Sequence, residues 1–448
     1  MKYGKGHTIY FLGIGGIGMS ALARYFHQKN AEIWGYDRVR SKLTDQLEKE
    51  GMHLHFEDDL NEIPKKIDLV IYTPAIPKNL EEFKYFSSQK VQMMKRAEVL
   101  GALTENFYTI AIAGTHGKTT ITSMIAHILH TAGKNITAFI GGIANNFGSN
   151  LVADPDSEFM IVEADEFDKS FLQLKPEIAV ITSTDADHLD IYKNHETLIH
   201  TFEKFIHNIE PEGLLILKNG IKLKKGNNYI TYGFPSDSNA FADQISIENG
   251  SFFFNLHLEN EITKVKMQVP GRHNIENALA AAAVASKLGI KSNIIALALS
   301  TYKGVWRRFD IKINTPSFVY IDDYAHHPAE LHACISTAKE LFPDKKITGV
   351  FQPHLFTRTR DLMDEFSQSL GFLDELILLD IYPARELPIP GISSQALLEK
   401  IILKNKFLVP KQQLIAFIDK CKPQVLITLG AGDIDQLVEP IQHHFELC

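Results

Sequence analysis

The sequence predicts an α/β protein that is divided into three domains. Short apolar runs rich in β-branched residues alternate with segments whose apolar residues recur at helical spacing, a pattern typical of parallel sheets covered by helices. Two glycine-rich turns, at 13–18 and 114–120, each follow such a run and precede such a helix. A chain of 448 residues is too long to fold around a single hydrophobic core, so we expect it to form two or three domains.

The bulk composition excludes several classes of protein. An apolar fraction of 45% and a charged fraction of 22% are those of an ordinary globular protein. A net charge of −8 leaves no basic excess to neutralise phosphates, which argues against a general nucleic-acid binder. The cysteines are odd in number and widely spaced, so we expect no disulfide framework or zinc knuckle, and a reducing cytoplasm fits. They are Cys334, Cys421 and Cys448.

The N-terminus superficially resembles a secretory signal. Lys2 and Lys5 precede an apolar run that ends in Ala21-Leu-Ala23. Glycines inside the run make a poor signal helix, and no other stretch has the length needed to span a bilayer. The sequence therefore predicts a soluble protein without membrane insertion.

The first glycine turn lies in a strand–turn–helix unit. The pattern predicts a strand over His7–Leu12, a helix from Met19 to about Lys29, and a second strand, Glu32–Tyr36, that ends at Asp37. A G-x-G-x-x-G turn followed by an acidic residue suggests NAD, but any ligand with a pyrophosphate can bind at that helix N-terminus. A turn without a ligand is the structural alternative. Further strand and helix patterns follow over 69–72 and 91–103, so we place the end of the first domain at residue 104.

The second glycine turn has the features of a phosphate loop. It follows the apolar strand Tyr108–Ile112 and precedes a helix predicted over Thr119–Ala132. Glycines let backbone N–H groups turn towards phosphate oxygens, Lys118 can reach the β- and γ-phosphates, and the Thr119 hydroxyl can hold Mg²⁺. Ile112 stands where the general Walker pattern requires glycine, and this shorter motif points to a group of ATP-dependent ligases. The alternative is a tight turn between buried elements.

Acidic segments follow the next two predicted strands. The strand Phe159–Val162 delivers Glu163 at its end, and Ile178–Ile181 leads into 183–190, which contains His188. In a parallel sheet the carboxyl ends of strands share one edge, so both segments are expected beside Lys118. Helix caps or an ordinary hydrogen-bonding histidine are the alternatives. Taken together at successive strand ends, they are interpreted as Mg²⁺ ligands.

The rest of the chain continues the alternation. We expect a helix over 201–209, strands between 229 and 269, and an alanine-rich helix from Gly271 to Leu288. The second boundary is placed near Asp310. The third domain is expected to contain strands over 318–321, 347–351, 376–379 and 425–429. The last of these is followed by Gly430-Ala-Gly-Asp433, which we interpret as a second phosphate-friendly turn.

Several segments, in this order along the chain, match one family. They are Gly13-Ile-Gly-Gly-Ile-Gly-Met-Ser20, Gly114-Thr-His-Gly-Lys-Thr-Thr120, Glu163-Ala-Asp-Glu166, Asp187-His-Leu-Asp190, Gly271-Arg-His-Asn274, Asp322-Asp-Tyr-Ala-His-His-Pro328, Phe351-Gln-Pro-His354 and Gly430-Ala-Gly-Asp-Ile434. On these segments the chain resembles the Mur ligases of peptidoglycan synthesis. They span nearly the whole chain.

The resemblance implies a domain plan and a reaction class. Residues 1–104 would form a Rossmann-like domain that binds a UDP-sugar, 105–310 a central phosphate-loop ATPase domain, and 311–448 a Rossmann-like domain that receives the amino acid. The branch it resembles most joins L-alanine to UDP-N-acetylmuramate in the cytoplasm, using ATP and Mg²⁺ with Mn²⁺ as a substitute. The implied state is a monomer or weak homodimer.

The resemblance also implies site residues. The UDP-sugar would be held by Gly13, Ile14, Gly15, Gly16, Ile17, Gly18 and Asp37. ATP would be held by Gly114, Thr115, His116, Gly117, Lys118, Thr119, Thr120, Asn274, Asn277, Arg308 and Asp323. Lys118, Glu163 and His188 would be catalytic, with Thr119, Glu163 and His188 as metal ligands. The amino acid would be held by Tyr324, His326, His354 and Arg358.

The chain departs from the family pattern at three places. Thr182-Ser183 stands where Thr-Asn is expected, and Leu355-Phe356 stands where Arg-Tyr is expected, so one cationic contact is missing. Some sister ligases carry a carbamoylated lysine near the second metal. Lys204 lies in that region, but an exposed helix lysine is the simpler interpretation.

Four other functions remain open at this point. A ligase that attaches recycled tripeptide to the same UDP-sugar is the nearest, although Gln352-Pro-His354 favours the alanine-adding branch. Folylpolyglutamate synthetase belongs to the same superfamily. A nicotinamide dehydrogenase would leave the Lys118 loop without a role. A nucleotide-binding regulator would not need Glu163 and His188.

Overall fold

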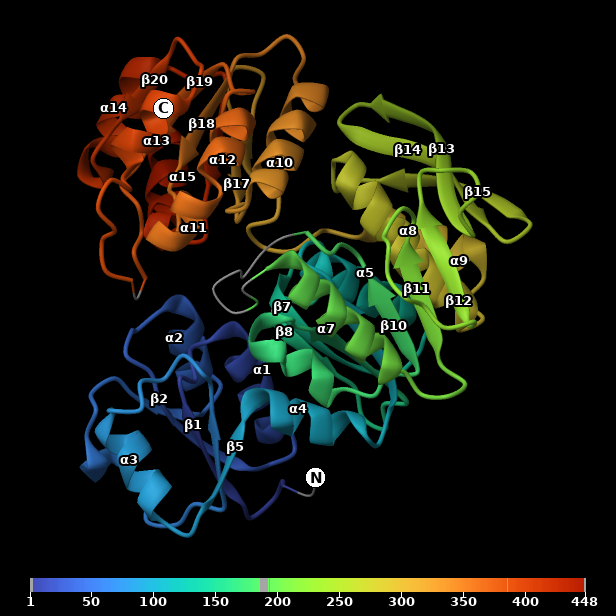
Figure 1. Cartoon of the computed structure of the whole chain (residues 1–448), viewed down its shortest axis with the longest axis vertical. Helices are drawn as coiled ribbons and strands as arrows, with labels where there is room; N and C mark the ends of the chain where they lie inside the picture. The colour runs from blue at the N-terminus through green and yellow to red at the C-terminus, as the bar shows by residue number, and fades with distance from the viewer. Residues whose placement is uncertain (1–2, 186–191, 193, 385, 447–448) are drawn as a thin grey trace. The chain divides into compact units, whose positions relative to one another are not determined.

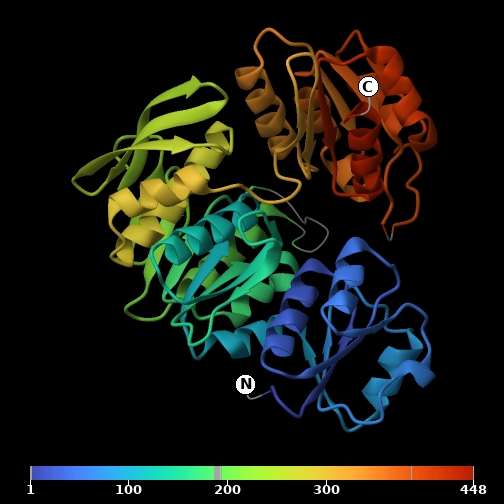
Figure 2. The same cartoon turned by 180° about the vertical axis from the view of Figure 1, so that it is seen from behind.

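The structure is a computed structural model that describes residues 3–185, 192, 194–384 and 386–446. Within these ranges helices and strands alternate around three sheets, as Figure 1 shows from one side and Figure 2 from behind. The predicted α/β class is therefore confirmed.

The first sheet is parallel and has the strand order β3-β2-β1-β4-β5. Its strands are β1 (Thr8–Leu12), β2 (Glu32–Tyr36), β3 (His53–His55), β4 (Leu69–Tyr72) and β5 (Gln92–Lys95). Its helices are α1 (Ile17–Gln28), α2 (Lys42–Lys49), α3 (Glu81–Ser88) and α4 (Arg96–Thr104), with a 3₁₀ turn η1 (Leu60–Glu62). The order reverses at β1, and ligands of such sheets bind at that point.

The second sheet has ten strands in the order β15-β14-β13-β12-β11-β10-β6-β9-β7-β8. They are β6 (Tyr108–Ala113), β7 (Ile136–Ala144), β8 (Ser149–Ala153), β9 (Phe159–Ala164), β10 (Ile178–Ile181), β11 (Leu214–Lys218), β12 (Tyr229–Gly233), β13 (Ala240–Glu248), β14 (Ser251–Leu258) and β15 (Glu261–Met267). The helices are α5 (Lys118–Thr131), α7 (His195–His207), α8 (Arg272–Lys287) and α9 (Ser292–Thr301), with η2 (Phe167–Gln173). Strand β6 is parallel to both its neighbours, β9 and β10.

The third sheet has the order β16-β17-β21-β18-β19-β20, with β16 antiparallel to β17 and the other pairs parallel. The strands are β16 (Asp310–Asn314), β17 (Val319–Asp323), β18 (Ile347–Phe351), β19 (Glu375–Leu378), β20 (Lys406–Leu408) and β21 (Val425–Leu429). The helices are α10 (Pro328–Leu341), α11 (Phe356–Asp361), α12 (Met363–Leu370), α13 (Ser394–Lys400), α14 (Leu414–Cys421) and α15 (Val438–Glu446), with η3 (Lys411–Gln413) and η4 (Asp433–Leu437).

The predicted boundaries of four elements, α1, β9, β17 and α7, were wrong. Helix α1 begins at Ile17 and not at Met19, because the last two residues of the glycine turn already form its first turn. Glu163 lies inside β9, and Asp323 is the last residue of β17, because pairing with the central strand of each sheet extends these strands through the acidic residue. Helix α7 begins at His195, six residues before its predicted start, with Asn194 as its cap.

The described chain forms two compact units. The first contains 1–243, 255–265 and 276–303, and hence the first sheet and most of the second. The other contains 244–254, 266–275 and 304–448, and hence the third sheet.

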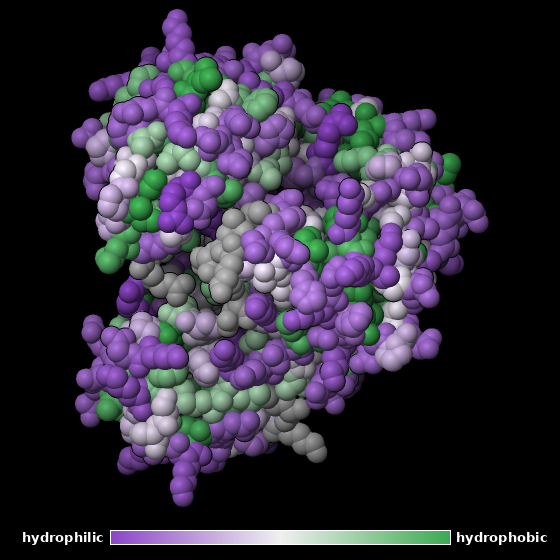
Figure 3. Space-filling model, viewed as in Figure 1, coloured by the Kyte–Doolittle hydropathy of each residue, from purple (hydrophilic) through white to green (hydrophobic). Residues whose placement is uncertain are grey.

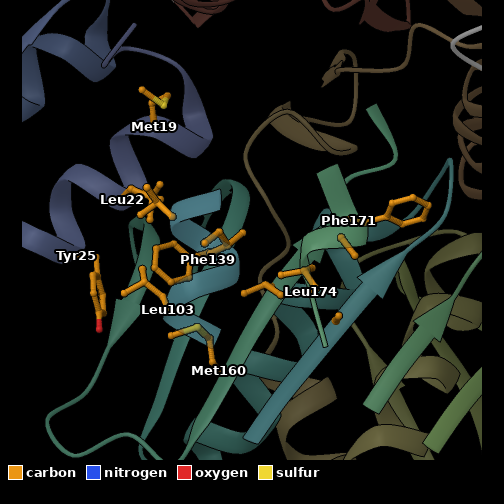
Figure 4. Close-up of a cluster of buried hydrophobic side chains, with 14 of the residues drawn as sticks. Met19, Leu22, Tyr25, Leu103, Phe139, Met160, Phe171 and Leu174 are labelled. Atoms are coloured by element: carbon orange, nitrogen blue, oxygen red, sulfur yellow. The ribbon is translucent and has the colours of Figure 1, made fainter. Parts of the chain in front are cut away.

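A continuous hydrophobic core joins the first two sheets within the first unit. Phe139 of β7 lies near Leu22 and Tyr25 of α1 and near Leu103 of α4 (Figure 4). The rings of Tyr25 and Phe139 are 5.6 Å apart between centroids. Helix α1, which follows the first glycine turn, is therefore packed directly against the sheet that carries the phosphate loop.

Buried polar groups reinforce this junction. Asn150 of β8 is fully buried, and its Nδ2 donates to the carbonyl oxygen of Ile17 at 2.6 Å and to Ser20 Oγ at 2.9 Å. Its Oδ1 accepts a hydrogen bond from Arg24, whose guanidinium also forms an ion pair with Glu50 at 2.8 Å. Because an unpaired buried polar group is costly, this network fixes the first turn of α1 on β8.

The surface shows ordinary polarity. On the face seen in Figure 3, hydrophilic residues predominate and hydrophobic ones occur in small groups. In the part of the chain that the structure describes, no helix has the length and apolar character needed to cross a membrane.

Replacing Asn150 with Ala should destabilise the first unit. The change removes the donor to the carbonyl of Ile17 and the acceptor for Arg24, which should cost about 2–3 kcal/mol. The midpoint of urea unfolding, followed by circular dichroism, should fall. Asn135→Ala is the matched control, because Asn135 is exposed. Equal midpoints for the two variants would contradict a stabilising role for the Asn150 network.

Candidate active site

The glycine turn after β1 is shaped by Asp37. Gly13 has φ +87°, a conformation that favours glycine, and its N–H donates to the carbonyl of Tyr36 at 2.8 Å. Asp37 accepts from the N–H of Gly15 at 2.8 Å and from the N–H of Val39 at 3.2 Å. Asp37 thus holds the turn itself, and its predicted place near the uridine stays a prediction.

The end of this turn forms the N-terminus of α1. Ile14 is buried, Gly16 is the N-cap without a side-chain capping bond, and Ile17 and Gly18 start the helix. A Cβ on Gly18 would lie 2.9 Å from Nη1 of Arg96, at the start of α4. A guanidinium beside an uncapped helix N-terminus favours anion binding. The sequence alone did not reveal Arg96, because the nearness of α1 and α4 depends on the strand order.

The phosphate loop requires glycine at two positions. Gly114 has φ +131° and Gly117 has φ +83°. A Cβ on Gly114 would lie 2.1 Å from Oγ1 of Thr182, and one on Gly117 would lie 2.7 Å from Oδ1 of Asn277. Helix α5 begins at Lys118 with no side-chain cap, so the N–H groups of its first turn can serve an anion.

The segment after β10 holds the phosphate loop through hydrogen bonds. The hydroxyls of Thr115 and Ser183 are 2.8 Å apart, and the N–H of His116 donates to Ser183 Oγ at 2.9 Å. Nε2 of His116 lies 3.4 Å from the carboxylate of Asp185. Ser183, one of the departures from the family pattern, therefore keeps a direct hydrogen bond to the loop backbone. Thr120 is buried in α5, and its contact with nucleotide stays a prediction.

Glu163 is held between the loop helix and β7. It pairs with Ile112 in the sheet register, accepts from the hydroxyl of Thr119 at 3.1 Å, and accepts from the N–H of Gly141. A Cβ on Gly141 would come within 2.5–2.8 Å of the carboxylate atoms. Burial raises the pKa of Glu163, and the Gly141 N–H and Lys118 oppose that rise only in part.

Lys118 is paired with a carboxylate that sequence reasoning did not assign. Its Nζ donates to both carboxylate oxygens of Glu166, at 2.7 and 2.9 Å, and to the carbonyl of Gly114 at 2.6 Å. Burial acts to lower the pKa of Lys118, but Glu166 and Asp165 outweigh it and the net pKa is raised. The lysine is therefore cationic at neutral pH.

The metal site stays a prediction. His188 lies outside the described residues, so its role stays a prediction. Among the residues that the structure describes, no cluster of three His, Cys, Asp or Glu side chains forms a metal site. The Thr119 hydroxyl and the Glu163 carboxylate are adjacent oxygen donors, which suits Mg²⁺. A cation there would also offset the burial of Glu163.

The two asparagines of α8 lie one turn apart. Asn274 is buried, and its Nδ2 donates to the carbonyl of Pro270 at 2.6 Å. Asn277 reaches the phosphate loop, as its closeness to Gly117 shows. Their predicted approach to adenine stays a prediction.

Asp323 ends β17 in a cluster of backbone donors and charges. It accepts from the N–H of Phe309 and from the N–H of Ala325, both at 2.7 Å. Burial raises the pKa of Asp323 to about 6, against the opposing effect of Arg308 and these N–H groups. Arg308 lies 3.5 Å from Glu330. The acid and the arginine predicted to serve ATP are thus close together in the second unit.

The four residues predicted to hold the amino acid lie near one another. The ring centroid of His326 is 5.1 Å from that of Tyr324 and 6.2 Å from that of His354. Burial lowers the pKa of His326 to about 4, and the charge of Arg358 adds to that lowering. His354 also stacks on Tyr382, with centroids 5.7 Å apart. Sequence reasoning did not single out Tyr382.

Leu355 has a strained backbone. Its φ is +71°, which is rare for a residue with a branched side chain. Its N–H donates to the carbonyl of Tyr382 at 2.9 Å, and it caps α11, which carries Arg358. The position therefore sets the bend between His354 and Arg358, even without the expected cationic side chain.

The second phosphate-friendly turn was wrongly interpreted. The amide of Gln352 fills it, with Oε1 accepting from the N–H of Ile434 at 2.9 Å and Nε2 donating to Asp433 at 2.8 Å. A Cβ on Gly432 would lie 2.5 Å from Gln352 Oε1, and one on Gly430 would lie 2.9 Å from its carbonyl oxygen. The glycines are needed to accommodate a side chain of the protein itself.

The candidate residues fall into two groups. The glycine turns, Asp37, Lys118, Thr119, Glu163 and Asn277 belong to the first unit. Asn274, Arg308, Asp323 and the amino-acid candidates belong to the second. Each group has an internal geometry that suits its predicted ligand.

Three sequence models of one family cover most of the chain. The model described as "Mur ligase family, catalytic domain" matches residues 8–108, "Mur ligase middle domain" matches 112–285, and "Mur ligase, glutamate ligase domain" matches 307–432. The predicted three-domain organisation is thereby confirmed, whereas the boundaries at 104 and 310 stay predictions.

Full-length relatives carry a specific name. The chain is 48% identical to the UDP-N-acetylmuramate–L-alanine ligase of Flavobacterium psychrophilum, with both chains covered completely. It is 46% identical to the protein of that name from Parabacteroides distasonis, over 99% of this chain and 98% of the relative.

Solved structures agree with this similarity. The crystal structure of the UDP-N-acetylmuramate–alanine ligase from Thermotoga maritima has a TM-score of 0.85 at 27% identity, covering 98% of this chain and 99% of that one. A murein peptide ligase from Psychrobacter arcticus shares the fold, with a TM-score of 0.75 at 21% identity over 98% of each chain.

Replacing Gly141 with Ala should weaken divalent-cation binding. The new Cβ would push the Glu163 carboxylate away from Thr119, and displaced ligand geometry should raise the dissociation constant for Mn²⁺ in the presence of ADP by about tenfold. Paramagnetic titration measures that constant. Gly226→Ala is the control, because a Cβ there meets no atom within 4 Å. Unchanged Mn²⁺ affinity in Gly141→Ala would argue against Glu163 as a ligand.

Proposed function

Because the chain belongs to the Mur ligase family, we propose that it is an ATP-dependent ligase that joins L-alanine to the carboxylate of UDP-N-acetylmuramate, giving ADP and phosphate. The observation that carries this proposal is the full-length identity to relatives named for that reaction. The geometry supports it, since a phosphate loop with a buried cation and carboxylate suits phosphoryl transfer.

The chemistry solves a leaving-group problem. A carboxylate does not condense with an amine in water, because its oxygen leaves poorly. The substrate carboxylate attacks the γ-phosphate, the bond to the β-phosphate oxygen breaks, and an acyl phosphate and ADP form. The neutral amine then attacks the acyl carbon, and phosphate leaves. Every group in the first step is anionic, so Lys118 and the first-turn N–H groups of α5 contribute by neutralising and aligning charge.

The cation site would be formed by Thr119 and Glu163, with His188 as a further proposed ligand. Bound Mg²⁺, or Mn²⁺ in its place, supplies a Lewis acid for the phosphate oxygens. Gly141 holds Glu163 through its N–H, which orients the carboxylate for that role.

The UDP-sugar is proposed to bind at the N-terminus of α1. The uncapped first turn and the nearby guanidinium of Arg96 offer donors to a pyrophosphate. Asp37 keeps the turn in the required shape through the N–H of Gly15.

The amino acid is proposed to bind among Tyr324, His326, His354 and Arg358. Nδ1 of His326 lies 3.0 Å from the carbonyl of Tyr324. A carbonyl only accepts, so Nδ1 carries the proton of the neutral ring and Nε2 is left as an acceptor suited to the amino group. Arg358 can hold the carboxylate in a bidentate way.

We also propose a cytoplasmic location and a monomer or weak homodimer. Two of the three proposed substrates, ATP and UDP-N-acetylmuramate, are nucleotides of the cell interior, and the three cysteines suit reducing conditions. The domain limits 1–104, 105–310 and 311–448 are proposed as well.

Phosphate release should depend on L-alanine. With ATP and UDP-N-acetylmuramate present, L-alanine should give the highest rate, and serine and glycine should be poor but detectable, because one small group changes binding by about 1–3 kcal/mol. Bulky amino acids should fail. A coupled phosphate assay measures each rate.

Two further arms separate the alternatives. If the tripeptide L-Ala-γ-D-Glu-diaminopimelate outcompetes alanine, the recycling-ligase function replaces the proposed one. Without an amine, hydroxylamine should trap the acyl phosphate as a hydroxamate. Consistent failure to trap it, with ADP forming only when alanine is present, would favour a concerted reaction.

Replacing Arg358 with Ala should raise the KM for alanine by about ten- to a hundredfold, because a charged hydrogen bond is lost. The KM for UDP-N-acetylmuramate should stay nearly unchanged. Steady-state kinetics with each substrate varied gives both constants. Arg360→Ala is the control, since Arg360 lies on the same helix but is exposed and paired with Asp361. Equal effects of the two changes would remove Arg358 from the amino-acid site.

A further inference from the structure

The phosphate-loop lysine already has a complete set of hydrogen-bond acceptors. An ammonium group has three N–H bonds, and Lys118 Nζ has three acceptors within 2.9 Å. One is the carbonyl of Gly114, which belongs to the loop. The other two are the carboxylate oxygens of Glu166. Lys118 therefore has no donor left for a phosphate oxygen while this pair is intact.

Glu166 is built into the site. Its side chain is only 1% exposed, against 16% for Lys118. Its backbone carbonyl accepts from the hydroxyl of Tyr192 at 2.5 Å and from the N–H of Lys169 at 2.9 Å. These bonds anchor the backbone from which the carboxylate reaches the lysine. The contact is thus fixed from both sides and is not a chance surface pair.

A nucleotide cannot simply add to this arrangement. Its phosphates carry negative charge, and in a buried site a neighbouring carboxylate repels them strongly. To accept Lys118 as a donor, the phosphates must take the place of Glu166 on Nζ. The free energy needed to separate Lys118 from Glu166 then makes the binding free energy of the nucleotide less favourable.

We propose that Glu166 is a positioning residue that acts as an exchangeable counter-ion for Lys118, and that the β- and γ-phosphates of a nucleotide displace it. In the nucleotide-free protein it keeps the ammonium group of Lys118 paired and directed at the loop. The inference rests on the proposed function only in that the Gly114–Thr120 loop must bind a nucleoside di- or triphosphate. It does not depend on which amine is joined.

Removing the charge of Glu166 should tighten nucleotide binding. Isothermal titration of the full-length protein with ADP and Mg²⁺ should give a dissociation constant about tenfold lower for Glu166→Gln than for the wild type, since one charged hydrogen-bonded pair no longer has to be broken. The KM for ATP should fall while kcat does not rise. A residue with only a structural role would weaken binding when changed and would not tighten it.

The matched control is Asp165→Asn. Asp165 is the neighbouring acid, half-buried, and paired with Arg96 at 3.6 Å and not with Lys118. Asp165→Asn removes the same unit of charge from the same segment but no hydrogen-bond acceptor of Lys118 Nζ. If displacement of that acceptor is what limits affinity, this variant should change ADP affinity less than twofold. Equal tightening in both variants would mean a general charge effect and would overturn the exchange.

Glu166→Asp covers the case in which Glu166→Gln fails to fold. It keeps a buried negative charge but shortens the side chain by one methylene, which lengthens the contact with Lys118. It should also bind ADP more tightly, by a smaller factor. Unchanged or weaker binding in the folded variants overturns the inference. A wild-type protein that binds no ADP would instead overturn the nucleotide assignment of the loop, and hence the proposed function.

Discussion

The parallel pairing of β6 with β9 on one side and β10 on the other is the constraint on which the candidate site depends. Its register sets Ala113, the last residue of β6, opposite Ala164 in β9 and Ile181 in β10. The phosphate loop therefore emerges between the acidic segment after β9 and the Thr182–Asp185 segment. Because parallel strands end at one edge, the same pairing that builds the core also brings the loop and the carboxylates together. The close approach of the segments at this edge also explains why residue 114 is a glycine, since Thr182 leaves no room for a Cβ there.

Buried cations mark the places where separate segments are tied together. Arg307 is 5% exposed and donates to Asp322 and to the carbonyl of Gly430, both at 2.8 Å, which joins the segment before β16 to the loop after β21. Arg24 joins α1 to β8 in the same manner through Asn150. Buried ion pairs often add little net stability, because desolvation offsets their attraction. Here the two arginines contribute mainly by holding the segments that they join in one arrangement.

The sequence predicted the sheets well because their central strands are buried apolar runs. The predicted limits of β2, β4, β10, β18 and β21 agree with the structure, as all five strands have short apolar sequences bounded by turns or polar residues. The phosphate loop was predicted equally well, since its glycines lie between a recognisable strand and a recognisable helix. Contacts that depend on strand order could not be predicted from the sequence. The N–H of Gly141 on Glu163 and the guanidinium of Arg96 beside Gly18 join elements distant in sequence. The interpretation of the turn at Gly430 as a phosphate site was wrong for the same reason, because only the fold places Gln352 inside that turn.

The charges at the phosphate loop indicate that a nucleotide bound there, as proposed, would need a divalent cation. Glu163, Asp165 and Glu166 bring carboxylates to the edge that Lys118 shares, so the lysine alone cannot balance their negative charge. Burial raises the pKa of Glu163, because removing the carboxylate from water disfavours its charged form. Adding a triphosphate would multiply that cost unless positive charge entered with it. Mg²⁺ carried by the proposed nucleotide would meet this need, and the neutral hydroxyl of Thr119 would add a ligand without adding charge. In the proposed exchange, Lys118 would pass from Glu166 to the phosphates and add its positive charge to that of the ion.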